Sequence, residues 1–255
     1  PTPGVLSRAS AAAVAKRTMI EEITLTDFLS FGPGAHTLRL RPLNVLIGPN
    51  GSGKSNLVEA FAVLRAVPKD LPLPIRQGGG VDEWIWSKGD QQGADSASLE
   101  VRFEPQQIAA ASVRYKLQFG SDAGAFVVLD ERIENAQVDK HHSKPYFYFG
   151  YESGRPMLNN AKGTKRALER ADLDRTQSIL SQRRDPESYP EVAATGDRLK
   201  EILIYRSWSF GPQSSIRAAC RADVQTDRLL EDFSNLPARL SVLKGSPGTK
   251  KRLLE

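Results

Sequence analysis

Residues 48–55 form the segment of the sequence with the clearest chemistry. In order they are Gly48, Pro49, Asn50, Gly51, Ser52, Gly53, Lys54 and Ser55, which satisfies the pattern G-x-x-x-x-G-K-[ST]. Glycine permits a tight curve in which successive backbone N–H groups point inward, and a following helix adds the positive end of its dipole. A concave surface of this kind binds phosphate groups.

Two side chains of this segment, hereafter the phosphate loop, supply specific chemistry. Lys54 brings a mobile ammonium to the β and γ phosphates, and the Ser55 hydroxyl can ligate Mg²⁺. The pattern therefore predicts ATP and Mg²⁺ as cofactors, with Lys54 in a catalytic role. The residues expected to contact the nucleotide are Gly48, Asn50, Gly51, Ser52, Gly53, Lys54, Ser55 and Asn56. The alternative is a glycine-rich turn with an incidental Lys-Ser pair.

The sequence on both sides of the phosphate loop predicts the elements that position it. Residues 43–47 are almost continuously apolar, which is typical of a strand covered on both faces. After the loop, apolar residues recur at helical spacing and predict a helix that ends before Pro68. These residues are Leu57, Val58, Phe61 and Leu64. Strand, loop and helix thus occur in the order that the motif requires.

The remaining periodicities predict a fold of the α/β class. Short alternating segments around Ile23 and Leu38, joined by the FGPG turn at 31–34, indicate a β-hairpin. Residues 68–95, with Trp84 and Trp86, have no clear period and predict a long excursion from the core. We expect a P-loop NTPase core with a mixed sheet, into which other segments are inserted.

Two such insertions and a tail are expected. Alternating segments at 98–103, 112–119, 125–133 and 145–152 predict an antiparallel β lobe over 95–160, and the charged composition predicts a helical segment over 163–203. Residues 1–18 are basic and rich in Ser and Ala, and we expect a tail there that is flexible or foreign to the natural protein. Residues 19–255 are then the ATPase head.

The overall composition says more about where the protein is located than about what it does. The net charge of +5 and pI near 9.3 favour polyanionic partners only weakly. No apolar run approaches the roughly 18 to 20 residues of a membrane span, and the single cysteine, Cys220, cannot form an internal disulfide. We expect a cytoplasmic protein without membrane contact.

The string from Leu43 to Asn56 resembles the ATPase heads of the SMC/RecF group within the ABC superfamily. The segment Asp27-Phe28-Leu29-Ser30-Phe31-Gly32 resembles the start of those heads, although Leu29 stands where a basic residue is common. The sequences around Ser181-Gln182-Arg183, Trp208-Ser209-Phe210 and Leu229-Leu230-Glu231 are similar to predicted bacterial ATPases of the RecF-like, OLD-related branch.

This resemblance implies a mechanism and partners. Two heads dimerise around ATP, and the cycle drives a process on DNA or on a nuclease partner, in repair or anti-phage defence. In such heads a loop glutamine reaches the Mg²⁺ and the attacking water, and Gln182 is the candidate for that catalytic and metal-binding role. The plain alternative for Gln182 is a polar residue at a helix end.

The heads of that group also use a signature segment and an acidic Walker B strand late in the chain. Residues 125–131 resemble such a Walker B strand, since the four apolar residues Phe126 to Leu129 precede Asp130 and Glu131. We interpret this as an ordinary alternating strand, because the pattern continues through Arg132 and Ile133. As the sequence stops within a charged, unfinished helix at 249–255, we expect the N-terminal portion of a longer head, whose hydrolysis needs the rest.

Two other functions stay open. One is a nucleotide-gated binding subunit in which ATP is a switch and turnover is negligible. The other is an AAA+-type ATPase that uses Asp130 and Glu131.

Three further features have alternative readings. Residues 162–184 hold seven basic and three acidic residues, which suits either nucleic-acid contact or a solvated helical face. The aromatic residues at 146–151 suit either strand packing or base stacking. His141-His142 indicates a polar turn, because no third ligand has a suitable spacing for a metal site.

Overall fold

The computed structural model describes residues 19–87, 93–105, 112–139, 142–160, 162–169, 171, 173–206, 211–212, 214–217 and 227–244. The chain divides into two compact units, Pro1–Ile202 and Leu203–Glu255, and each is described by itself. The predictions for residues 1–18, 208–210 and 249–255, for His141 and for Cys220 lie outside the described residues. Within the described part, no helix is long and apolar enough to cross a membrane.

The first unit contains one antiparallel sheet of eight strands in the order β2-β1-β3-β4-β5-β6-β7-β8. The strands are β1 Ile20–Thr26, β2 His36–Arg39, β3 Ser96–Phe103, β4 Val113–Asp122, β5 Ala125–Asn135, β6 Phe147–Glu152, β7 Arg155–Asn159 and β8 Lys165–Ala167. The expected mixed sheet is therefore wrong for the described residues, because all seven pairings are antiparallel. The predicted hairpin and meander are both present.

The meander is continuous with the N-terminal hairpin. Ile23 of β1 pairs with Leu38 of β2 on one side and with Val101 of β3 on the other. Ile23 and Leu25 are fully buried, as their alternation predicts. The strands expected to form an inserted lobe thus extend the hairpin's own sheet, since β1 offers a free edge that β3 can pair with.

The two faces of this sheet differ in chemistry. One face carries the buried side chains of Tyr115, Leu117 and Phe119. The other carries charges that alternate across the strands, with Arg102 Nε 2.9 Å from Glu21 and Arg114 paired with Glu134. A partly exposed pair such as Arg102–Glu21 stabilises a fold little, whereas the buried Glu134 carboxylate needs its pairing with Arg114. The sheet's stability therefore comes mainly from its apolar face.

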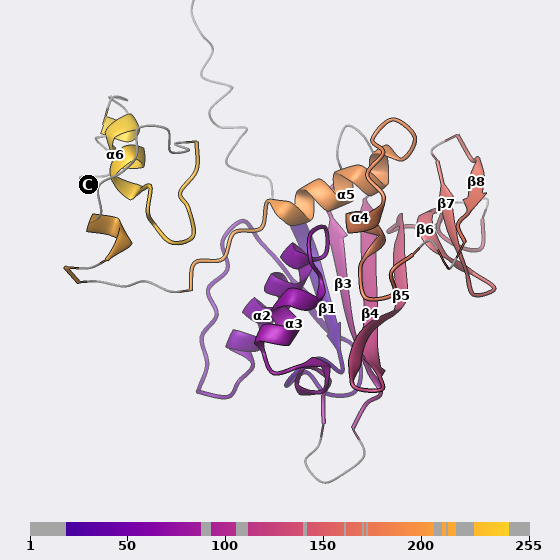
Figure 1. Cartoon of the computed structure of the whole chain (residues 1–255), viewed down its shortest axis with the longest axis horizontal. Helices are drawn as coiled ribbons and strands as arrows, with labels where there is room; N and C mark the ends of the chain where they lie inside the picture. The colour runs from indigo at the N-terminus through magenta and orange to yellow at the C-terminus, as the bar shows by residue number, and fades with distance from the viewer. Residues whose placement is uncertain are drawn as a thin grey trace, which may run out of the picture. The chain divides into compact units, whose positions relative to one another are not determined.

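Helices cover the apolar face, as Figure 1 shows. They are α2 Lys54–Ala66, α3 Pro72–Gln77, the 3₁₀ helix η2 Val81–Trp84, α4 Ile179–Gln182 and α5 Pro190–Lys200. Leu57 and Leu64 of α2 are buried as predicted, whereas Val58 and Phe61 are only half-buried. The guanidinium of Arg198 in α5 lies 5.1 Å from the Phe103 ring centre.

The strand expected at 43–47 is absent. This segment is irregular, and Leu43 and Ile47 are 81% and 91% exposed. No described strand pairs with it. A strand with two covered faces requires neighbours for its backbone as well as for its side chains. The apolar composition alone therefore does not produce a strand here, because the described residues give the segment no partner.

The predicted helical segment at 163–203 is only partly helical. It begins with β8 and a loop, and the α-helices among its described residues are α4 and α5. The second unit contains the 3₁₀ helix η4 Ser215–Arg217 and α6 Leu236–Lys244. Within it, the Asn235 amide binds Arg228 O at 2.7 Å and accepts from Leu230 N at 2.9 Å, which orders the turn before α6.

Candidate functional site

The phosphate loop ends where α2 begins. Gly53 is the N-cap of α2 and has φ 84°, and Gly51 has φ 79°. Only glycine adopts this left-handed region at little cost, so the two glycines fix the curve of the loop. The first N–H groups of an α-helix have no partner within the helix. The N–H groups at the start of α2 therefore lie next to the loop and are available to a ligand there.

Lys54 closes this curve. Its Nζ donates to Gly48 O and Pro49 O, both at 2.7 Å, and to Ser52 Oγ at 3.2 Å. The ammonium therefore lies over the residues that open the loop, while the backbone of Lys54 begins the helix. Ser55, one residue further, is exposed.

This arrangement fits a triphosphate with Mg²⁺. The donors that a phosphate needs are the helix N–H groups and Nζ of Lys54, which at present binds neutral carbonyls. Phosphate oxygens are stronger acceptors for an ammonium than carbonyls are. Asn50 and Ser55 are exposed, so the loop can reach a ligand from solvent. The helix and Lys54 thus match the motif, whereas the strand that the motif requires before the loop is absent from the described residues.

A second segment, the turn at 27–31, supports the loop from behind. Asn56 Nδ2 donates to Ser30 Oγ at 2.8 Å, and a Cβ at Gly53 would lie 3.0 Å from the same oxygen. The resemblance included Ser30 but assigned it no role. Its hydroxyl touches both the loop and the first turn of α2.

The two tryptophans, unassigned from sequence, position that turn. Leu29 N donates to Trp84 O at 3.0 Å, and Trp86 N donates to Asp27 O at 2.9 Å. The Trp84 ring is buried 5.8 Å from the Phe28 ring. The excursion at 68–95 therefore returns to hold the turn, and paired aromatic residues in a segment without period were the signal for it.

Gln182 lies in α4, apart from the start of α2. Its amide accepts from Asp174 N at 2.8 Å and donates to the carbonyls of Asp174 and Gln177, each at 3.0 Å. Gln177 in turn contacts Leu71 N and Asp70 Oδ1, beyond the C-terminal end of α2. A 13-residue helix spans roughly 20 Å. A bond from Gln182 to a metal at Ser55 therefore requires a different arrangement of these segments.

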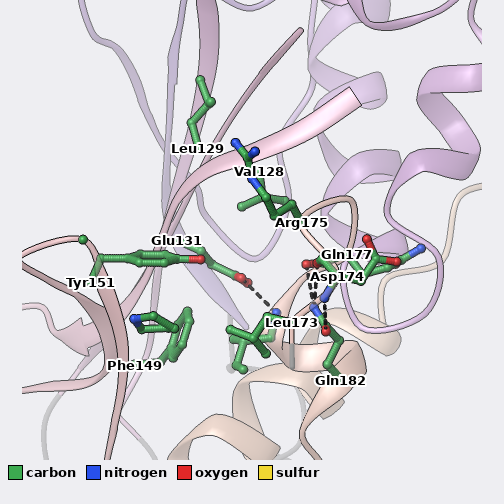
Figure 2. A pocket seen from close by; sticks show the side chains of 13 residues that line it. Val128, Leu129, Glu131, Phe149, Tyr151, Leu173, Asp174, Arg175, Gln177 and Gln182 are labelled. Carbon is green, nitrogen blue, oxygen red and sulfur yellow. Dashed lines mark hydrogen bonds between the residues drawn. The ribbon is translucent and has the colours of Figure 1, made fainter. Parts of the chain in front are cut away.

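Asp130 and Glu131 lie in the antiparallel strand β5, which continues to Asn135. The Glu131 carboxylate is 1% exposed and accepts from Tyr115 OH at 2.9 Å, from Ile179 N at 2.9 Å and from the Ser178 hydroxyl. Figure 2 shows it pointing toward the start of α4, at a cavity of about 190 Å³ that Gln182 also lines. Glu131 thus joins the sheet to α4.

Burial controls the protonation of this carboxyl. Loss of solvent raises the pKa of Glu131 from 4.5 to about 7, against the opposing effect of its hydrogen bonds from Ser178, Ile179 and Tyr115. Burial likewise raises the pKa of Tyr115 well above 10. Near neutral pH the carboxyl therefore exists in both protonation states.

Comparisons with known proteins assign the sequence that contains the loop to a family. The family model described as "AAA domain, putative AbiEii toxin, Type IV TA system" matches residues 43–218. No curated protein matches the sequence. A solved structure described as "Structural biochemistry of ATP-driven dimerization and DNA stimulated activation of SMC ATPases" is 20% identical, covering 48% of this chain and 73% of that chain, with a TM-score of 0.38.

A second solved structure is described as "Crystal structure of the SmcHead bound to the C-winged helix domain of ScpA". It is 18% identical and has a TM-score of 0.35. The match covers 46% of this chain and 35% of that chain.

Proposed function

The chain belongs to this AbiEii-related AAA-domain family, whose model covers most of its residues, and we propose that it binds ATP with Mg²⁺ at the phosphate loop. The single observation that carries the proposal is the contact of Lys54 Nζ with Gly48 O and Pro49 O, at the start of a helix that opens on a left-handed glycine. An ammonium and helix N–H groups converge there, which is the requirement for binding a chain of phosphates.

Each residue of the loop has a separate role in this proposal. The N–H groups from Gly51 to Asn56 hold phosphate oxygens. The Ser52 N–H, which donates to Pro49 O at 3.3 Å, and the Lys54 ammonium exchange their loop carbonyls for phosphate. Ser55 Oγ ligates Mg²⁺, which neutralises phosphate charge when bound. Gly48 leaves room for the loop to close, because a Cβ there would lie 2.8 Å from Ser52 Oγ. Asn50 presents the exposed tip of the loop.

Calorimetric titration with Mg-ATP tests this function. The intact chain should bind, and Lys54→Ala should abolish binding without changing the melting temperature. Lys69→Ala is the matched control, because Lys69 is exposed beyond the other end of α2 and should leave the affinity unchanged. Equal binding by the wild type and Lys54→Ala would exclude the phosphate loop as the site.

We further propose that two such heads close around ATP and that closure acts on DNA or a nuclease partner. The resemblance of residues 43–56 to SMC/RecF heads supports this, and the family description favours defence over repair. Light scattering with and without Mg-ATP measures the step. A nucleotide-dependent dimer of the wild type, absent in Lys54→Ala, is the expected result, and a monomer under both conditions would contradict it.

A nucleotide-gated switch with little turnover is the second candidate function. The observation in its favour is that Glu131 is buried among Tyr115, Ser178 and Ile179, and is thus occupied by internal contacts. An AAA+ mechanism needs this carboxylate at the nucleotide. Vigorous phosphate release by residues 1–255 alone would reject the switch. Loss of that release in Glu131→Gln, with folding intact, would restore the AAA+ alternative.

A further inference from the structure

A second and larger cavity, of about 850 Å³, lies along β5 to β8, and neither the phosphate loop nor Gln182 lines it. Arg132 of β5 and Tyr148 and Gly150 of β6 form part of its wall. Glu131 and Phe149, their neighbours in sequence, line the cavity of Figure 2 instead. Phe147 and Tyr151 also line the larger cavity, hereafter the groove, and Tyr151 lines both, so the two cavities adjoin at β6.

Two polar atoms in the wall of this groove have unmet hydrogen-bonding capacity. Among the described residues, Arg132 Nε and Asn159 Oδ1 are buried and have no hydrogen-bond partner. Asn159 is only 2% exposed, and its Nδ2 already donates to Phe147 O at 2.9 Å. Buried polar groups in folded proteins are almost always paired. A molecule that enters the groove and displaces the groups covering these two atoms could pair with one donor and one acceptor.

Aromatic rings border the same groove. The Tyr146 and Tyr148 rings lie 5.3 Å apart, and Tyr146 is 37% exposed. Their hydroxyls are already used, since Tyr148 OH donates to Asn135 Oδ1 at 2.9 Å and Tyr146 OH donates to Asn160 O. A ligand would thus meet the ring of Tyr146 as an apolar face rather than its hydroxyl.

Charges of both signs line the groove, namely Arg132, Lys144 and Lys165 against Asp139 and Glu152. Residues 142–167 contain five basic side chains and only one acid, Glu152. The basic residues are Lys144, Arg155, Lys162, Lys165 and Arg166. Glu152 pairs with Lys165 at 3.0 Å, and the Lys165 ammonium also lies 5.4 Å from the Phe147 ring centre. Arg132 Nη1 also lies 3.7 Å from Glu134, so Lys144 is the lining cation that no described acid pairs with, and it favours an anionic group beside it.

We propose that this groove binds a single-stranded nucleic acid. An unpaired base offers a flat face for Tyr146 and an edge with adjacent donors and acceptors for Asn159 and Arg132. Its phosphates complement Lys144 and the cations along β8. A duplex hides its base faces in the stack and cannot make the first of these contacts. The site is separate from the phosphate loop and does not depend on nucleotide binding there.

Fluorescence anisotropy of the intact chain with a short labelled oligothymidylate, without ATP or Mg²⁺, tests this. Lys144→Gln should weaken binding and reduce the slope of log K against log salt by about 0.7, as one phosphate contact is lost. Arg132→Lys keeps the charge but removes Nε, and should weaken binding roughly tenfold at an unchanged slope. Lys69→Gln is the control, because Lys69 is exposed beyond the end of α2 and does not line the groove.

Further measurements distinguish this proposal from ATP binding at the phosphate loop and from nonspecific binding. Lys54→Ala should bind the oligonucleotide as the wild type does, so failure of ATP binding leaves this result unaffected. Melting temperatures of the variants should match the wild type. No binding at low salt would overturn the proposal. So would an equal loss in Lys69→Gln and Lys144→Gln, equal affinity for a duplex, or equally effective competition by free thymidine monophosphate.

Discussion

The side-chain amide of Asn56 donates a hydrogen bond to the Ser30 hydroxyl at 2.8 Å, across 26 residues of sequence. Asn56 lies in the first turn of α2, and Ser30 belongs to the turn at 27–31 that Trp84 and Trp86 hold. The phosphate loop is therefore supported by a segment that makes no part of its motif. Either residue can be replaced to test this support.

Ser30→Ala should weaken ATP binding without unfolding the protein. Loss of one hydrogen bond costs about 1 kcal/mol, which corresponds to a roughly fivefold higher Kd. Thr24→Ala is the control, because the Thr24 and Thr37 hydroxyls are 2.9 Å apart in the β1–β2 hairpin, away from the loop. Calorimetry should show unchanged ATP affinity for Thr24→Ala. Equal affinities for both variants would show that Ser30 does not support the loop.

Gly53→Ala should disturb the loop more strongly. An alanine at φ 84° costs roughly 1 to 2 kcal/mol, and its Cβ would lie 3.0 Å from Ser30 Oγ. Gly196→Ala, within α5, is the matched control, because its Cβ would make only ordinary contacts from 3.7 Å outward. It should stabilise the protein by about 0.5 to 1 kcal/mol. Thermal unfolding measures the stability of both variants, and ATP titration measures their affinity. A Gly53→Ala variant as stable as Gly196→Ala would show that alanine at position 53 is not strained.

Glu131 should make stability depend on pH. Its folded pKa of about 7 exceeds the ordinary 4.5, so the folded state binds the extra proton between these values. The stabilisation is complete below pH 4.5 and is lost as pH rises to about 7, a change of about 3 kcal/mol. Chemical denaturation at a series of pH values measures this loss, and a Glu131 contribution that increases with pH would contradict it.

Glu131→Gln should remove this pH dependence. The amide is neutral, can accept from Ile179 N and can donate to the Ser178 hydroxyl, as the protonated carboxyl can. The variant should therefore be more stable than the wild type at pH 8. Asp130→Asn, at the half-buried neighbouring position, is the comparison variant: it should keep the loss of stability with rising pH but make that loss smaller, because the Asp130 charge contributes to the raised pKa of Glu131. A Glu131→Gln variant with the wild-type slope would assign the titration to another group.

Gln182→Ala tests whether this residue reaches the metal. The variant loses three hydrogen bonds to backbone groups and should be destabilised by about 1 to 3 kcal/mol. Gln177→Ala loosens the same loop through its contacts with Asp70 and Leu71, and no metal role is predicted for it. Phosphate release should fall further in Gln182→Ala than in Gln177→Ala. Equal losses would make the role of Gln182 structural.

The sequence by itself determined the local features of this protein. The glycines at 51 and 53 and the helix that follows depend only on φ preferences and apolar spacing, both of which are properties of neighbouring residues. For the same reason β1 to β6 were predictable from alternation. The family match to residues 43–218 is consistent with the motif.

Only the tertiary structure decided which segments are neighbours. It joined the hairpin and the meander into one sheet, left Leu43 and Ile47 without a described strand partner, and brought Ser30 to Asn56. It also buried Glu131 beneath α4, so that an apparent catalytic acid became a link between elements. These outcomes depend on which backbone and side-chain groups form hydrogen bonds and contacts with residues far away in the sequence. Local sequence patterns do not specify those pairings.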